Sequence, residues 1–301
     1  MLAAGGAAGS GQEALTGETR FAIIARSSLG AAISLRVLIL GSGSSGNATL
    51  VETSTTRVLV DAGFNRKETL RRLAALGAAV DGVHGIFVSH EHSDHISGLA
   101  NLSRSWNAPV YITAGTYAEY QRLVPREDVQ KIRGVETLQP SRRFQVGDIE
   151  VTSFSIPHDA ADPVGFTLRA EGFKVSIVTD LGYLPAHVRE HLRGSDLLVL
   201  ESNHDLEMLK VGPYPWHIKQ RVMSRTGHLS NHAVSEFLAD GEGFDAQARW
   251  LVLAHLSENN NNPDLARLSA EEALGRRPAE TAFAGELHIA SQRTPLGPFV
   301  L

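Results

Sequence analysis

Short apolar runs that end in His or Asp constrain the fold of this chain most strongly. Val175–Asp180 and Leu251–His255 each run through β-type residues to one polar side chain, and Val58–Asp61 does the same earlier in the chain. Gly85–Ser89 is a similar run that leads directly into a group of histidines. Such runs are typical of strands that are buried on both faces. We therefore expect a sheet architecture whose strand ends carry the functional residues.

The segment Val88–His95 gathers three imidazoles and the carboxylate of Asp94, which are ligand types that divalent transition metals prefer. His90 and His92 are two residues apart on an extended turn and can point toward one ion. Asp94 and His95 can then turn toward a second ion, as in two-metal hydrolysis. The alternative is a solvated, His-rich surface loop.

Three later residues extend this candidate metal site. His158 follows one apolar run, Asp180 ends a second and His255 ends a third. Taken singly, His158 could be an exposed loop imidazole and Asp180 could cap a turn. Together they place ligand-type side chains at successive strand ends. We therefore expect seven metal ligands: His90, His92, Asp94, His95, His158, Asp180 and His255.

Composition narrows the chemistry. The chain has 0 cysteines, so a metal site must use His, Asp and Glu, and disulfides and thiolate nucleophiles are excluded. The net charge of −5 allows a nucleic-acid substrate only through a local basic patch. No uninterrupted apolar run of about 18 residues is present, so we expect neither a transmembrane helix nor a membrane partner.

The chain is expected to have two parts. Residues 1–33 are predicted to be a disordered or non-essential N-terminal extension, because they begin with a stretch rich in Gly, Ala, Ser and Thr. They lack the basic start and clean apolar core of a secretory signal. Residues 34–301 are predicted to form one folded domain.

Hydrophobic patterning predicts mixed strands and helices over this domain. Strands are expected at 36–40, 48–52, 57–61, 85–89, 110–113, 174–180, 196–201, 250–254 and, last, 286–290, with β-rich material over 136–170. Helices are expected at 65–76, 95–103, 114–123, 184–192, 206–225, 232–238 and 264–274. Two β-halves with helices outside explain this order better than a simple βαβ repeat. The predicted fold class is α/β, a four-layer αββα sandwich.

Gly41, Gly43 and Gly46 imitate a dinucleotide-binding fingerprint, with Asp61 about twenty residues further on. That fingerprint requires a helix directly after the glycines, whose N-terminus holds the pyrophosphate. Here residues 47–52 are strand-like, and no crossover helix fits before the next strand. We expect a tight turn beside the active site instead.

The pattern His-x-His-x-Asp-His, followed by single His, Asp and His residues, resembles the metallo-β-lactamase superfamily over residues 35–290. The resemblance implies the metallo-β-lactamase fold and two divalent metal ions, zinc or manganese. It implies these ligands: His90, His92 and His158 for one ion, Asp94, His95 and His255 for the other, and Asp180 as the bridge. By the same resemblance Asp61 would orient the cluster from behind the ligands.

Within the superfamily the chain resembles compact phosphodiesterases. It lacks the cysteine ligand common in zinc β-lactamases, and little chain follows His255 to form the helical domain of glyoxalase-II-like thioesterases. Glu201 and His228 lie in segments that resemble motifs of tRNase-Z-like enzymes. The resemblance implies that Asp94, Glu201 and His228 are catalytic, with His228 protonating the leaving oxygen. His228 could instead be a loop residue that caps a helix start.

Longer motifs resemble the YycJ family, also called WalJ or VicX: residues 40–47, 89–95, 201–205, 212–215, 227–231 and 255–260. The resemblance implies a bacterial cytoplasmic hydrolase with DNA exonuclease activity, linked to a two-component system that regulates the cell wall. The long arm by which tRNase Z grips tRNA has no counterpart in the sequence, which argues against tRNA processing.

Cations and aromatic residues alternate between Glu201 and His228, which fits a patch that grips a nucleic-acid strand through phosphate pairing and base stacking. The alternative is a solvated amphipathic helix with ordinary surface cations. The expected substrate-binding residues are Asn203, His204, Lys210, Lys219, Arg221 and Arg225.

Taken together, we expect a dinuclear metallohydrolase that cleaves phosphodiester bonds at DNA ends, with DNA preferred over RNA. One alternative is hydrolysis of a small ester, thioester or lactone by the same metals. Another is a regulatory binding protein that keeps the metal site. The sequence makes no prediction of oligomeric state.

Overall fold

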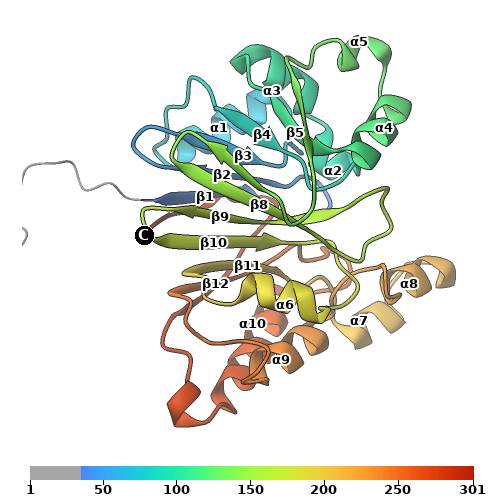
Figure 1. Ribbon diagram of the computed structural model, residues 1–301. Coiled ribbons are helices and arrows are strands. Elements are labelled where there is room, and N and C mark those ends of the chain that lie inside the picture. Colours follow the sequence, from blue (N-terminus) through green and yellow to red (C-terminus); the bar gives the residue numbers. More distant parts are fainter. Residues whose placement is uncertain (1–34) are drawn as a thin grey trace, which may run out of the picture. The chain divides into compact units, whose positions relative to one another are not determined.

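Two seven-stranded mixed sheets form the centre of the molecule, and helices lie on the outer side of each sheet (Figure 1). The computed structural model describes residues 35–301, so the extension expected over residues 1–33 lies outside the described residues. Between residues 35 and 301, no helix is long and apolar enough to span a bilayer. The predicted αββα sandwich is confirmed.

Each sheet contains seven strands, and each strand is hydrogen-bonded to its neighbours in the following spatial order. Across the first sheet they are β14 (Leu296–Val300), β1 (Arg36–Gly41), β2 (Ala48–Glu52), β3 (Arg57–Val60), β4 (Gly85–Phe87), β5 (Val110–Thr113) and β6 (Val135–Leu138). Across the second they are β13 (Glu286–Ile289), β12 (Trp250–Ala254), β11 (Leu197–Glu201), β10 (Phe173–Val178), β9 (Val164–Ala170), β8 (Ile149–Ser155) and β7 (Arg143–Val146).

The helices divide between the two sheets. On the side of the first sheet lie α1 (Arg66–Ala75), α2 (Ser93–Ile96), α3 (Leu99–Trp106), α4 (Ala114–Leu123) and α5 (Arg126–Val129) (Figure 1). On the side of the second lie α6 (Ala186–Leu192), α7 (Leu206–Val211), α8 (Trp216–Val222), α9 (Asn231–Ala239), α10 (Pro263–Gly275) and the short 3-10 helix Ala279–Thr281.

Alternate side chains of the central strands enter different apolar layers. Val37 and Ile39 of β1 lie in the layer between the sheets, whereas Leu38 and Leu40 pack with the helices α1 and α3. Val252 of β12 lies in the same central layer, and its two neighbours in the chain pack with α9 and α10. The strands therefore read as continuous apolar runs because each sheet is covered on both faces.

Both sheets change from antiparallel to parallel pairing partway across. β3 and β4 are parallel neighbours in the first sheet, and β10, β11 and β12 are parallel neighbours in the second. The carboxyl ends of parallel neighbours lie at the same edge of a sheet, and the loops after them are the usual place for a ligand site in α/β folds. These loops carry most of the candidate metal ligands.

Several elements differ from the sequence-based expectation. β14 was not expected; it pairs antiparallel with β1 and forms an edge of the first sheet. Its Gly297 and Pro298 weaken the strand signal, although Pro is tolerated on an edge strand. The single helix expected over 206–225 is instead the pair α7 and α8, because Gly212 and Pro215 interrupt it.

Two glycines allow the loop after β3 to pack against the α2 turn. A Cβ atom added at Gly63 would lie 1.8 Å from the carbonyl oxygen of Asp94, and one added at Gly98 would lie 1.9 Å from that of Phe64. Gly98 also separates α2 from α3, where one continuous helix was expected. These close backbone contacts fix the position from which the α2 turn presents Asp94 and His95.

Gly63→Ala is expected to lower the free energy of unfolding by at least about 2 kcal/mol, because the added methyl group must displace the backbone of Asp94. The matched control is Gly275→Ala at the end of α10, where an added Cβ meets nothing within 4 Å. There we expect no loss, or a gain of up to about 1 kcal/mol from helix propensity. Urea denaturation of both variants measures the difference; equal midpoints would contradict the packing role of Gly63.

Candidate metal centre

The seven residues expected as metal ligands meet at one end of the sandwich. They are His90, His92, Asp94 and His95 after β4, His158 after β8, Asp180 after β10 and His255 after β12. Five of the side chains are buried, and His92 and Asp94 are partly exposed. Four loops that are distant in sequence therefore supply one cluster.

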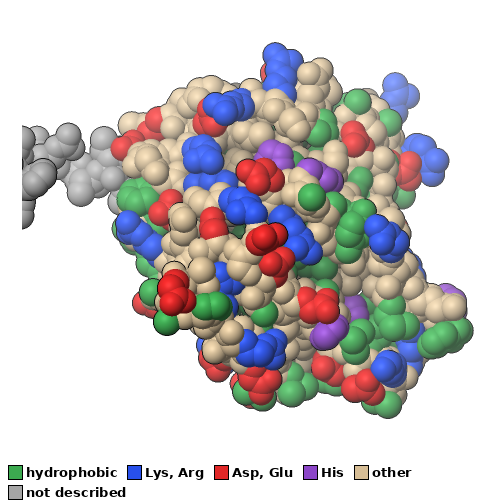
Figure 2. Space-filling view, turned by 60° about the horizontal axis from the view of Figure 1, so that its bottom comes forward, with side chains coloured by type: hydrophobic (Ala, Val, Ile, Leu, Met, Phe, Trp, Pro, Cys, Tyr) green, Lys and Arg blue, Asp and Glu red, His purple; other side chains and the backbone are tan. Residues whose placement is uncertain are grey.

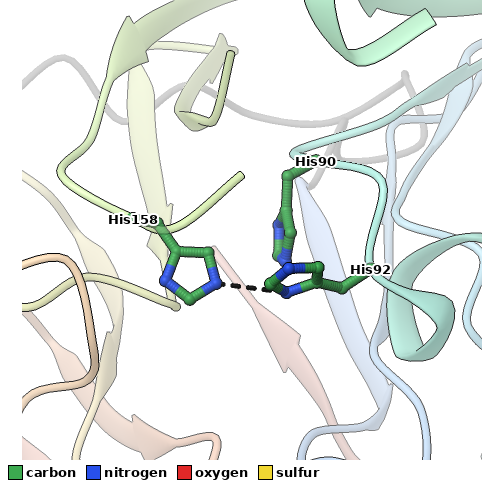
Figure 3. Close-up of side chains that lie close together, drawn as sticks. All are labelled: His90, His92 and His158. Carbon is green, nitrogen blue, oxygen red and sulfur yellow. Dashed lines mark hydrogen bonds between the residues drawn. The ribbon is translucent and has the colours of Figure 1, made fainter. Parts of the chain in front are cut away.

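His90, His92 and His158 form the first group, and Figure 3 shows the ring of His158 facing those of His90 and His92, which come from a different loop. One ring nitrogen of each lies within 4.8 Å of the corresponding nitrogens of the others. Nε2 of His158 lies 3.2 Å from Nδ1 of His92. Nδ1 of His158 donates to the carbonyl oxygen of Gly227 at 3.2 Å, so its Nε2 keeps a lone pair for the centre. This group can supply three nitrogen ligands to one ion.

Asp94, His95 and His255 form the second group. Oδ2 of Asp94 lies 3.4 Å from Nε2 of His95 and 3.4 Å from Nε2 of His255. The Asp180 carboxylate lies between the two groups, with Oδ2 3.3 Å from Nε2 of His95 and Oδ1 4.0 Å from Nε2 of His158. A carboxylate in this position can contact an ion in each group.

The chemistry of this centre fits divalent cations. Within the described part of the chain, Nε2 of His90 and Oδ2 of Asp180 are buried without a hydrogen-bond partner, which costs free energy. Burial lowers the pKa of the His255 imidazole, but Asp180, Asp94 and Glu201 raise it to about 10. The centre therefore offers ligand atoms without hydrogen-bond partners, several carboxylates and a mixture of imidazole and carboxylate, which together suit a divalent transition-metal ion.

Asp61 orients two of the imidazoles from behind, where the sequence analysis expects it. Its Oδ2 accepts from Nδ1 of His95 at 2.8 Å and from the Ser89 hydroxyl at 2.9 Å. The Ser89 oxygen lies 3.0 Å from Nδ1 of His90. One carboxylate therefore turns the Nε2 atoms of both rings toward the centre.

Three non-glycine residues of the centre adopt the left-handed backbone conformation. φ is 59° at Asp61, 63° at Asp180 and 55° at His255. Each comes directly after, or two residues after, the end of a parallel strand. This conformation costs on the order of 1 kcal/mol for a non-glycine residue, and such strain persists where the surroundings hold it in place. It turns the chain sharply at the strand end and directs the side chain into the cluster.

Asn47 is a supporting residue that the sequence analysis misses. Its Nδ2 donates to the carbonyl oxygen of Gly43 at 3.1 Å and to Oδ2 of Asp94 at 3.0 Å. The expected tight turn is present, and its glycines make room for neighbours: a Cβ added at Gly46 would lie 2.4 Å from the Phe64 ring. The position of Asn47 at the end of this turn is the one sequence signal that could have identified it.

Glu201 and His228 form a hydrogen-bonded pair beside the two groups. Nδ1 of His228 donates to Oε1 of Glu201 at 2.8 Å, and Oε2 of Glu201 accepts from the backbone N–H groups of Leu181 and Leu229, both at 3.0 Å. Burial raises the pKa of the Glu201 carboxyl, but His228 and His255 lower it to about 2. Burial lowers the pKa of His228, whereas Glu201 raises it above its usual value. Since 19% of the His228 side chain is exposed, a substrate can reach its ring.

Three of the six expected substrate-binding residues lie where a substrate cannot reach them. Asn203 and His204 are buried, and Nδ2 of Asn203 donates to the backbone oxygen of His255 at 2.9 Å. Lys219 is also buried, and its Nζ donates to the carbonyl oxygen of Lys210 at 2.6 Å. Asn203 and Lys219 thus hold neighbouring backbone in place. The burial of all three side chains argues against the expected role in substrate binding.

The other three expected residues lie near the surface, but each already has a partner. Lys210 pairs with Glu207, Arg221 pairs with Asp159, and the Arg225 guanidinium lies over the ring of Tyr183. On the face drawn in Figure 2, basic and acidic side chains are interspersed. The α7–α8 segment is therefore a weaker phosphate-binding surface than its sequence suggests.

Comparison with known proteins agrees with this geometry. The Beta-lactamase superfamily domain matches residues 56–256. The exodeoxyribonuclease YycJ of Bacillus anthracis is 36% identical over 261 residues, which cover 87% of this chain and 97% of that protein. The exodeoxyribonuclease WalJ of Streptococcus pneumoniae is 32% identical over 81% of this chain and 90% of that protein.

A solved structure shares the fold. YhfI of Bacillus subtilis, a metallo-β-lactamase fold protein, has a TM-score of 0.66 at 19% identity, covering 89% of this chain and 99% of that one. With the domain match and the two relatives, this shows that the chain belongs to the metallo-β-lactamase superfamily and, within it, to the family of YycJ and WalJ.

Proposed function

We propose that this chain is a nuclease that uses two divalent metal ions to hydrolyse phosphodiester bonds at DNA ends. The observation that supports this most is the position of the Asp180 carboxylate between two three-residue groups, with the Glu201–His228 pair beside them. Two relatives that match most of the chain are named exodeoxyribonucleases. Zinc and manganese both suit the His and Asp donors.

The ligands divide between the ions as follows. His90, His92 and His158 would hold one ion, Asp94, His95 and His255 would hold the other, and Asp180 would contact both. When bound, the ions supply Lewis-acid charge and a water of lowered pKa. Asp61 and Asn47 keep the ligands in orientation through the hydrogen bonds described above.

We assign the role of general acid to His228. Because its Nδ1–H donates to Glu201, its Nε2 is the nitrogen that can carry a proton to the leaving oxygen. The neighbouring carboxylate raises the pKa of this imidazole, so the ring retains its second proton to a higher pH than a free histidine does. Glu201 therefore acts through His228, by orienting the ring and stabilising its charged form.

A substrate panel on one metal-loaded preparation tests the proposed activity. We expect release of nucleotides from end-labelled linear DNA, slower cleavage of RNA and no turnover of thioesters or lactones. A closed circular DNA of the same sequence should stay intact, because it offers no end. Thioester or lactone turnover without nuclease activity would overturn the proposal.

Asp180→Asn is expected to weaken metal binding by roughly ten- to a hundredfold or more, because the amide keeps the shape but loses the charge shared between the ions. Asn also tolerates the left-handed conformation of this position, so the fold should persist. Equilibrium dialysis with elemental analysis measures the bound metal. The control is Asp81→Asn, whose carboxylate is 98% exposed; equal metal content in both variants would contradict the bridging role.

His228→Ala is expected to reduce kcat on DNA by roughly 10²- to 10⁴-fold with unchanged metal content, because the leaving oxygen loses its proton donor. The loss should be much smaller on bis(p-nitrophenyl) phosphate, since p-nitrophenolate leaves without a proton. His232→Ala, at an exposed position on α9, is the control. Equal losses on both substrates would exclude His228 as the general acid.

A further inference from the structure

An open groove of about 600 Å³ lies between the start of α1 and the exposed face of α3. Its lining contains four cations and no acidic residue: Asn65, Arg66, Lys67, Asn101, Arg104, Ser105 and Arg133. An adjoining hollow of about 400 Å³ shares Arg104 and Arg133 and adds Lys131, Gln130 and Glu127. The two hollows together contain five cations, of which Lys131 is paired with Asp128, on a chain whose net charge is −5.

The four cations of the groove are available to a ligand. Arg66, Lys67, Arg104 and Arg133 are exposed, and among residues 35–301 their side chains make no hydrogen bond and no ion pair. The cations of α7 and α8, in contrast, are paired or buried. Like charges held together without counter-ions repel one another and create a positive field, which is the condition for binding a polyanion.

A second cavity connects this groove with the metal centre. It has a volume of about 410 Å³ and is lined by His92 and by apolar side chains that include Ile96, Tyr120 and Leu123 of α2 and α4. Its two acidic residues already have partners: Asp128 pairs with Lys131, and Glu91 accepts from the backbone N–H of Ala161. Asn101 of α3 lines both the cavity and the basic groove. The cavity and the groove together therefore form a track, which begins at the candidate ligand His92, passes the apolar side chains of the cavity and ends at the four cations of the groove.

The dimensions suit one nucleic-acid strand. α3 has 8 residues and is thus about 12 Å long. The rise of about 3.4 Å per phosphate is measured along a duplex axis, and the path along one strand is longer, so this length spans about two to three phosphates. The aromatic and aliphatic wall near His92 suits the base and sugar of a nucleotide, and the cations beyond it suit its neighbouring phosphates.

We infer that this track binds the DNA strand whose end lies in the metal centre. The cavity beside His92 holds the nucleotide next to the cleaved bond, and Arg66, Lys67, Arg104 and Arg133 hold phosphates farther along the strand. The inference rests on the proposed nuclease function and moves the main phosphate-binding surface from α7–α8 to the face of α1 and α3.

The double variant Arg104→Ala/Arg133→Ala tests the inference. Its matched control is Arg169→Ala/Arg276→Ala, which removes the same charge from two exposed arginines outside the groove. Binding of fluorescein-labelled DNA is measured by anisotropy in EDTA, where no cleavage occurs, over a series of salt concentrations. We expect roughly a tenfold or greater rise in Kd for the groove variant and little change for the control.

The salt dependence gives a second, independent readout. Each lost phosphate contact should reduce the slope of log K against log salt by about 0.9, so the groove variant should lose nearly two units of slope. With metal present, kcat/KM on DNA should fall at least tenfold more than on bis(p-nitrophenyl) phosphate. As a folding control, each double variant should unfold thermally at the same temperature as the wild type.

The two proposals fail in different ways. If the wild type cleaves DNA and the groove and control variants bind it equally well, the groove inference is wrong and the nuclease proposal stands. If the wild type binds DNA through the groove but hydrolyses no nucleic acid, the nuclease proposal fails and the binding site stands. Binding of the wild type to vesicles of anionic phospholipid, but not to DNA, would overturn the groove inference.

Discussion

The structure around the metal centre depends on negative charge that is buried where the strands of two sheets end. A buried carboxylate is stable only when donors or cations surround it. The Glu201 carboxylate accepts hydrogen bonds from two backbone N–H groups and two imidazoles, and the Asp61 carboxylate accepts them from Ser89 and His95. Asp180 keeps one buried oxygen without a partner in the described chain. Hydrogen bonds within the protein thus stabilise the carboxylates of Glu201 and Asp61, whereas the Asp180 carboxylate keeps an oxygen that can bind a cation.

Packing turns this requirement into a fixed geometry. The two sheets are held together by an apolar layer between them and are covered by helices outside, so the strand ends cannot move independently. Sharp left-handed turns at those ends point Asp61, Asp180 and His255 inward. The strain of these turns is small compared with the burial that holds the strands. The ligand positions are therefore set by the core and not by the loops alone.

Much of the fold and the candidate centre could be predicted from the sequence. Apolar runs ending in His or Asp identify strands and their polar ends, because strands buried on both faces leave few other places for such residues. Asn47 could not be found in this way, since its role depends on a contact with Asp94 across the fold. The charge of Lys219 predicts substrate binding, whereas its burial follows from how α8 packs on the end of α7.

The cations of the basic groove could not be predicted from the sequence either. Arg66, Lys67, Arg104 and Arg133 lie in three separate stretches of sequence, each with ordinary neighbours. Sequence proximity favours the cations between Glu201 and His228, but in the fold these are either paired with acidic or aromatic partners or, like Lys219, buried. Whether cations lie close enough to create one positive field depends on the tertiary structure, and no local sequence pattern encodes it.

The hydrogen bonds of Ser89 have a consequence for the order in which ions bind. Ser89 and Asp61 connect His90 of the first group to His95 of the second, so the two groups share one support. On the proposed two-ion assignment, an ion in one group would restrict the shared support and Asp180 at the same time, and a second ion would meet ligands already ordered. On this basis the centre would fill cooperatively, passing at rising metal concentration from empty to doubly occupied with little singly occupied protein.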